Sequence, residues 1–247
     1  MNLYAKTRLM MVLSAILLIL LASASCTIKQ EITVHVDESG DASFEIAVED
    51  YFIEVIKDFE VFAEEDTDVT QENLDELALE LNDSEYTSDA IFEKVNDNFY
   101  RGTFNFSDLE EFFKELRKEE EETEVLSVFS YQKRGFVQNL TIHIDLDNYY
   151  QLKEIIPLLE DPEFAMFGPE ENVGVSEADY IDMIGFALGD EGPPSLRRSY
   201  IEVVIITDHP IISQKGGVLR SPNEIVFNIP MLDFLLLAEP IDRQVTW

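Results

Sequence analysis

The side chains of this 247-residue chain that could do chemistry are one cysteine, three histidines and 51 Asp and Glu, set against 17 Lys and Arg. Zinc binding and general-base catalysis need a histidine near a second ligand or a positioned partner. None of His35, His143 and His209 has another histidine three or four residues away. The chain also lacks G-x-S-x-G, G-x-G-x-x-G and G-x-x-x-x-G-K-[ST] patterns. The sequence therefore predicts no catalytic residue, no metal site and no cofactor.

The acidic residues are too numerous for proximity alone to indicate an active site. The run from Asp37 to Asp41 alternates like a calcium loop, but Ala42 stands where such a loop needs Gly and Val48 where it needs Glu. A glycosidase needs two carboxylates at a defined separation in a cleft, which sequence does not reveal. We therefore expect a protein that is not an enzyme, with a hydrolase as the less favoured alternative.

Composition excludes several further classes. Apolar residues make up 46% of the chain, with 17 Phe and 9 Tyr, which is too many for a disordered acidic tail. A net charge of −34 excludes nucleic-acid binding by phosphate neutralisation, and it disfavours docking on anionic lipid by charge alone. A single cysteine excludes an internal disulfide framework.

The single cysteine, Cys26, directly follows a segment that has the pattern of an export signal. Residues 2–8 carry Lys6 and Arg8, residues 9–21 form an apolar run, and four small residues then lead to Cys26. This order is typical of a secretory signal peptide, and thirteen apolar residues are fewer than the roughly 20 needed to span a bilayer. An uncleaved anchor and ordinary cleavage after Ala24, leaving a free thiol, stay open as alternatives. The favoured interpretation is a lipoprotein signal peptide over residues 1–25.

The segment resembles a bacterial lipoprotein signal, in which small residues precede a cysteine that is lipidated and becomes the first residue of the mature protein. Ala24 and Ser25 match this pattern, whereas Ser23 stands where a leucine is usual. The resemblance implies several acyl chains, palmitate among them, attached to Cys26. Several chains hold a protein firmly at a membrane. We therefore expect an exported bacterial cell-envelope protein that reaches the membrane through its N-terminal lipid, with the membrane and leaflet undetermined.

Hydrophobic spacing predicts the elements that build the rest of the chain. Apolar residues at every second position predict a hairpin over 28–36 and 42–48 and a strand near 100–106. The same pattern predicts strands over 124–131, 136–146, 200–207, 211–219, 224–229 and 242–247. Helical spacing predicts helices over 50–63, 71–81, 88–95, 148–159 and 176–188, a helix opened by a capping box at 107–110, and a helical turn over 231–237. The Gly and Pro residues at 189–194 predict a break in secondary structure.

Strands joined by tight turns predict an α+β fold with a mainly antiparallel sheet. Two helical insertions, near residues 50–95 and 148–190, are expected to pack on that sheet. We expect residues 26–247 to form a single domain, with the first and last strands in the same sheet.

One apolar segment is a candidate ligand site. Phe164, Met166 and Phe167 lie between Pro and Gly residues, and Met183 and Phe186 follow on the next predicted helix. Because Met adapts to irregular shapes, these side chains could line a site for a lipid-like ligand. Plain core packing of the insertion is the alternative, and it is the more common fate of such residues.

The ends of the chain are similar to those of LppM-type bacterial lipoproteins. The N-terminal similarity consists of Cys26, the alternating strand that follows it directly, and a Ser39-Gly40 turn before the second strand. The C-terminal similarity covers Asn223-Glu224-Ile225-Val226-Phe227-Asn228-Ile229-Pro230, Leu235 to Leu237, Pro240 and Val245-Thr246-Trp247. This resemblance implies an envelope-anchored α+β domain with affinity for amphiphilic envelope molecules, and it supplies no catalytic residue.

These observations predict a non-catalytic, membrane-anchored lipoprotein of the bacterial envelope that binds an amphiphilic ligand. The alternative is an envelope assembly component that uses its acidic face to bind a basic envelope protein. A pocket lined by the apolar segment would favour the first function, and a flat exposed apolar patch would favour a protein interface.

Overall fold

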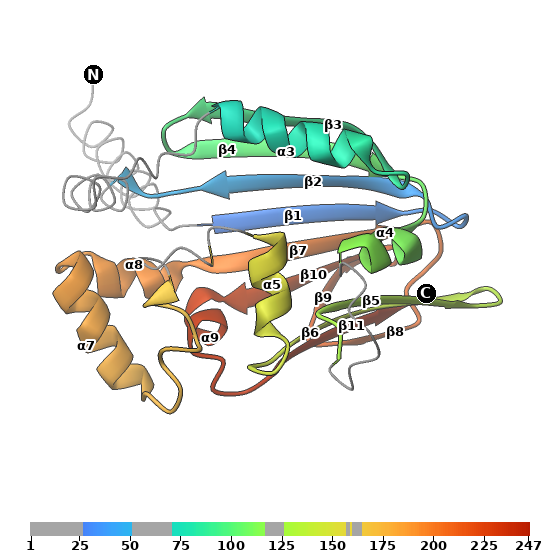
Figure 1. Ribbon diagram of the computed structural model, residues 1–247. Helices are drawn as coiled ribbons and strands as arrows, with labels where there is room; N and C mark the ends of the chain where they lie inside the picture. The colour runs from blue at the N-terminus through green and yellow to red at the C-terminus, as the bar shows by residue number, and fades with distance from the viewer. Residues whose placement is uncertain (1–26, 51–70, 117–125, 157–158, 160–164) are drawn as a thin grey trace, which may run out of the picture.

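The computed structural model describes residues 27–50, 71–116, 126–156, 159 and 165–247, and their strands form two sheets (Figure 1). The larger sheet has the order β3 (Thr87–Asn96), β4 (Phe99–Phe106), β2 (Gly40–Ala47), β1 (Thr27–Val34), β7 (Tyr200–Thr207), β10 (Glu224–Pro230) and β9 (Val218–Ser221). The smaller sheet has the order β5 (Phe129–Arg134), β6 (Val137–Ile144), β11 (Ile241–Thr246) and β8 (Ser213–Lys215). Neighbouring strands are antiparallel except β1 and β7, which are parallel. The α+β class and the mainly antiparallel pairing are confirmed.

The helices of the described residues are α3 (Gln71–Asp83), α4 (Leu109–Leu116), α5 (Tyr149–Ile155), α7 (Glu177–Leu188), α8 (Gly192–Arg198) and α9 (Met231–Leu236). Figure 1 shows α3 lying along β3 and β4, and α7 and α8 at the end of the large sheet where β1 begins. Helices α3, α5 and α7 confirm the helices predicted from residues 71, 148 and 176 onward. The helix predicted over 50–63 lies almost wholly outside the described residues.

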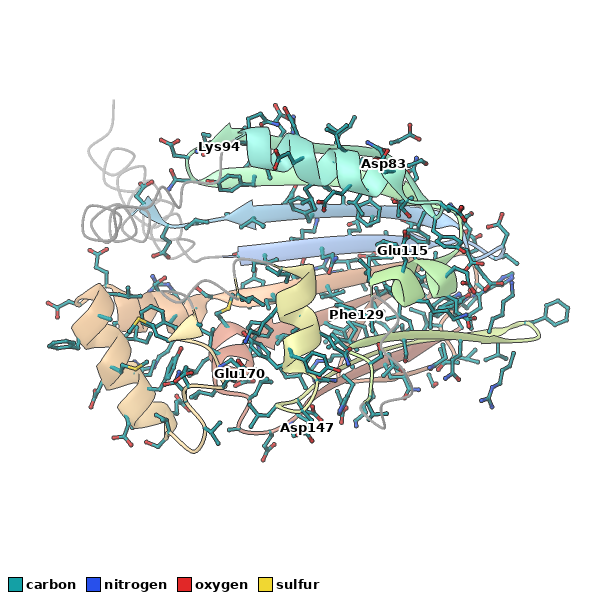
Figure 2. The ribbon with its side chains drawn as sticks, in the orientation of Figure 1. Asp83, Lys94, Glu115, Phe129, Asp147 and Glu170 are labelled. Atoms are coloured by element: carbon teal, nitrogen blue, oxygen red, sulfur yellow. The ribbon has the colours of Figure 1, made fainter. Side chains whose placement is uncertain are left out.

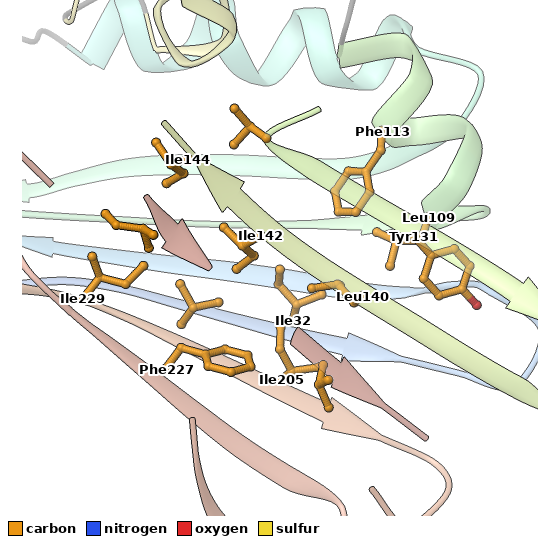
Figure 3. Packing of buried hydrophobic residues seen from close by; sticks show 14 of the residues in the cluster. Ile32, Leu109, Phe113, Tyr131, Leu140, Ile142, Ile144, Ile205, Phe227 and Ile229 are labelled. Carbon is orange, nitrogen blue, oxygen red and sulfur yellow. The ribbon is translucent and has the colours of Figure 1, made fainter. Parts of the chain in front are cut away.

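The main hydrophobic core lies between the two sheets. Inward side chains of β6, such as Leu140 and Ile142, face Ile32, Ile205 and Phe227 of the large sheet (Figure 3). Successive residues of a strand point to opposite faces, so the period-two pattern of the sequence supplies each sheet with one apolar face. The expectation that the first and last strands share a sheet was wrong. β1 belongs to the large sheet and β11 to the small one, although both contribute to this core.

The segment expected as a helix over residues 88–95 is instead strand β3. Its apolar residues at 91, 92 and 95 fit helical spacing, but pairing with β4 makes the segment a strand and divides them between its two faces. Ala90 and Phe92 are buried against Leu74 of α3, whereas Ile91 is 66% exposed on the other face. Asp89 has a φ of 54°, and the register shifts between Ser88 and Ile91. The first predicted insertion is therefore helical only in part.

The strand expected over residues 211–219 divides into β8 and β9, which belong to different sheets. Gly216 has a φ of 78°, a left-handed conformation that glycine adopts readily and that turns the chain between the two strands. A Cβ atom on Gly217 would lie only 2.6 Å from the rings or methyls of Ile225 and Phe227, so the chain passes close to the core here. Local alternation could not reveal this change of sheet.

Two helix boundaries also differ from expectation. Helix α4 is capped by Asp108, whose carboxylate accepts a hydrogen bond of 3.0 Å from the Glu111 N–H, rather than by Ser107 as the capping box suggested. The cluster expected to break the chain at 189–194 instead leads into α8, which has Pro193 in its first turn. Proline is tolerated there because the first N–H groups of a helix have no intrahelical acceptor.

Candidate functional site

The first described residue, Thr27, is also the first residue of strand β1. Its Cα partners are Ala47 on β2 and Tyr200 on β7. β1 is the central strand of the seven, and Cys26 itself lies outside the described residues. A group attached to Cys26 is therefore one peptide unit from the first residue of the central strand of the large sheet.

Helix α8 places two arginines at the end of the large sheet where β1 begins. Arg197 and Arg198 occupy its last turn, where basic side chains interact favourably with the helix dipole. Ser199 then joins the helix to β7 and is buried. Its hydroxyl donates a hydrogen bond of 3.0 Å to the Ser195 carbonyl, and its own carbonyl accepts one of 2.9 Å from the Met231 N–H. These bonds fix the junction against α9.

A hollow of about 320 Å³ opens beside this junction, and we call it the arginine hollow. Its lining consists of Arg197, Arg198, Ser199, Tyr200, Glu202, Asn228 and Pro230. Tyr200 pairs with Pro230, and Glu202 with Asn228, on neighbouring strands. These pairs alternate with Ile201, Val203 and Ile229, which belong to or pack on the main core. The hollow therefore lies on the face of the sheet that points away from the small sheet.

The arginine hollow is cationic in a strongly acidic chain. Within the described part of the chain, Arg197 forms no ion pair and no side-chain hydrogen bond. Arg198 lies 3.6 Å from a carboxylate oxygen of Glu49. The one acid of the lining, Glu202, already pairs with Arg220 at 2.9 Å. The arrangement leaves a guanidinium group, an exposed Asn228 amide and the Tyr200 hydroxyl available to an anion.

The structure separates the residues predicted to line an apolar ligand site. Phe167 and Met183 are half-buried and pack against a second hydrophobic cluster formed by Tyr180, Ile181, Ile184, Leu232 and Leu236. Met166 is 51% exposed and Phe186 is 95% exposed. Phe164 lies outside the described residues. None of the four described residues lines the arginine hollow, and the joint role of all five as a ligand site stays a prediction.

His143 forms the densest polar contacts on the small sheet. Its Nδ1 lies 2.6 Å from Asp242 and its Nε2 lies 3.0 Å from Asp145, so both ring nitrogens contact carboxylates. Asp242 also accepts a hydrogen bond of 2.9 Å from Lys215. Neither His143 nitrogen is left for general-base catalysis. No group of three or more His, Cys, Asp and Glu in the described residues is arranged to hold a metal ion.

These contacts shift the pKa of His143. Burial disfavours the charged ring, but the hydrogen bonds to Asp242 and Asp145 favour it more, so the pKa of His143 is raised. The bond to His143, followed by that to Lys215, lowers the pKa of Asp242. The pair therefore ties β6 to β11 most firmly when the imidazole is protonated and the carboxylate is ionised.

We expect His143→Gln to lower the free energy of unfolding by about 1 kcal/mol near pH 6, the scale of one hydrogen bond. Since the folded-state pKa is raised, the histidine contribution is fully present below about pH 6.5 and is lost as the pH rises through that pKa. Urea unfolding at about pH 6 and pH 9 should show the difference shrinking at the higher pH. His209→Gln, at an exposed turn, is the control. A difference that stays constant over this range would contradict the argument.

The sequence interpretation did not identify the arginine hollow. The available signal was the pair Arg197-Arg198 directly before a strand, in a chain with three times as many acids as bases. Its position next to residue 27 depends on the parallel pairing of β1 with β7, which no local pattern indicates.

No protein-family model and no curated protein matches this chain. Among solved structures, the chain is similar to the NMR structure of the folded domain of LppM from Mycobacterium tuberculosis. The alignment has a TM-score of 0.41 and 9% sequence identity, and it covers 90% of this chain and 89% of that chain. Among the described helices, none is long and apolar enough to cross a membrane.

Proposed function

We propose that this chain is a non-catalytic lipoprotein of a bacterial cell envelope, held at the membrane by acyl chains on Cys26. The observation that carries the proposal is the start of β1 at Thr27, directly after the chain's sole cysteine. An ordinary secreted protein has no need for its cysteine at the junction of signal and fold. A lipoprotein needs it there, because the acyl chains are attached to the first residue of the mature protein.

A binding role is favoured over catalysis by the chemistry of the described residues. His143, the histidine with the most polar contacts, has both ring nitrogens engaged by carboxylates. The arginine hollow contains two arginines and an amide, which bind anions, and the hydroxyl of its serine, Ser199, is hydrogen-bonded to a backbone carbonyl instead of a base.

An amphiphilic molecule of the envelope is the ligand that we propose. Phe186 and Met166 expose apolar surface next to the cluster on which Phe167 and Met183 pack. Apolar side chains of this kind can hold acyl chains, and Met adapts its shape to them. Phe186 belongs to α7, and Figure 1 shows α7 near the end of the large sheet where β1 begins.

The alternative, an assembly component that binds a basic envelope protein, is favoured by one observation. Helix α3 presents exposed Asp75, Glu76, Glu80 and Asp83, and its last turn contains no basic residue. Figure 2 shows that the exposed acids also include Glu115, Asp147 and Glu170 on other segments. Such a surface would attract a basic partner over about one Debye length, roughly 8 Å at physiological salt.

Native mass spectrometry of the full chain, extracted from bacterial membranes, tests these proposals together. The expected spectrum shows a mature protein that begins at Cys26, carries acyl groups on that residue and retains a co-purifying amphiphile. An unmodified thiol would contradict the lipoprotein assignment. Acylated protein without any bound amphiphile would contradict the ligand proposal, and a co-purifying basic protein would favour the alternative.

A further inference from the structure

We propose that the arginine hollow binds the phosphate of an anionic phospholipid headgroup in the bilayer that holds the anchor. The inference rests on the proposed lipidation of Cys26, and it adds a second, non-covalent contact between the domain and its own membrane. Such a contact would fix the orientation of the domain, which acyl chains on one residue leave free to vary.

The position of the hollow supports this ligand. Thr27 and Tyr200 are Cα partners on adjacent strands, which lie about 4.8 Å apart. One further peptide unit, about 3.8 Å, leads to Cys26. An acyl group on Cys26 thus begins within roughly 10 Å of Tyr200, which lines the hollow. This separation is comparable to the polar layer of a bilayer, which is about 5 to 8 Å thick on each side.

The chemistry of the lining also fits a phosphate ester. A guanidinium group can donate two parallel hydrogen bonds to phosphate oxygens, and such charge-assisted bonds are stronger than neutral ones. Arg197 has no competing ion pair in the described part of the chain, and the exposed Asn228 amide adds a neutral donor. The volume of about 320 Å³ lies at the lower end of the range for small-molecule sites.

The overall charge of the protein does not oppose this local contact once the anchor is in place. Residues 1–25 hold two basic residues and no acid, so the remaining chain has 15 basic and 51 acidic residues and a net charge of −36. That charge prevents docking on an anionic surface by electrostatics alone, but its repulsion decays over about 8 Å at physiological salt. The acyl chains supply the membrane affinity, and the arginines of the hollow then contact the headgroups.

The test uses the acylated full chain in detergent, titrated with phosphatidylglycerol, phosphatidylcholine or inorganic phosphate and observed by native mass spectrometry. The wild type should bind phosphatidylglycerol in preference to phosphatidylcholine. Arg197→Gln should weaken phosphatidylglycerol binding about tenfold, the effect of losing about 1.4 kcal/mol of charge-assisted hydrogen bonding. Arg197→Lys keeps the charge but cannot donate two parallel hydrogen bonds. Its affinity for phosphatidylglycerol should lie between those of the wild type and Arg197→Gln.

Arg134→Gln is the matched control. Arg134 is likewise exposed and without an ion pair in the described residues, but it lies at the β5–β6 turn, far from the start of β1 (Figure 1). The Arg134→Gln variant should bind phosphatidylglycerol with the same affinity as the wild type. Equal binding by wild type and Arg197→Gln, or equal binding of the two lipids, would overturn the proposal. Displacement by inorganic phosphate at the same concentration would identify free phosphate as the occupant. The mass of the same protein reports acylation, so a failed anchor is distinguished from an empty hollow.

Discussion

Cys26→Ala is expected to abolish incorporation of labelled palmitate into the protein. The chain has a single cysteine, so no second thiol can take over the acyl chains. Each buried CH₂ contributes about 0.8 kcal/mol, one chain gives only marginal binding, and two or more bind stably. Loss of all chains should therefore eliminate the label and the stable attachment of the mature domain to membranes. Growth with labelled palmitate followed by immunoprecipitation measures the first effect, and membrane fractionation measures the second.

Ser25→Ala is the control for this experiment, since it changes a neighbouring small residue and keeps the thiol. It should retain full labelling. Label that persists in Cys26→Ala would contradict lipidation at this residue. A wild-type protein that carries a free thiol and leaves the membrane in plain buffer would favour ordinary signal cleavage after Ala24, the alternative that the sequence leaves open.

The sequence predicts best those elements whose hydrophobic periodicity is visible within the element itself and whose apolar residues are then buried in the core. The β1–β2 hairpin shows alternation at Ile32, Val34 and Ala42, and these three side chains are buried in the main core. Helix α7 shows helical spacing, and its N-terminus is marked by Ser176, whose hydroxyl accepts a hydrogen bond from the Asp179 N–H. In both elements the periodicity and the local capping or turn chemistry agree, so distant contacts are not needed to choose the structure.

The features that the sequence does not predict depend on contacts between distant segments. The spacing of the apolar residues in β3 alone predicts a helix, and only the pairing with β4 makes the segment a strand. The parallel pairing of Thr27 with Tyr200 brings together segments that are separated in the sequence by strands β2 to β6 and helices α3 to α8. The same limit applies to the sites. Cys26 is recognisable from its immediate neighbours, whereas Arg197 and Asn228 meet only after β7 and β10 have paired.

The contact between the two sheets should dominate the stability of the domain. Phe227 on β10 is fully buried and belongs to the core cluster that joins the inner faces of both sheets (Figure 3). A Cβ atom on Gly217 would lie 2.6 Å from its ring, so the chain between β8 and β9 also passes against it. Removing this ring would leave a cavity bordered by segments from both sheets, which cannot close without moving one sheet relative to the other.

Phe227→Ala is therefore expected to lower the free energy of unfolding by about 3–5 kcal/mol, a large part of the about 5–15 kcal/mol typical of a folded protein. Phe136→Ala makes the same chemical change at the β5–β6 turn, where the side chain is 92% exposed, and should alter stability by less than about 0.5 kcal/mol. Urea midpoints of the two variants and the wild type measure the difference. Comparable losses in both variants would mean that Phe227 does not hold the sheets together, because exposed and buried rings would then contribute alike.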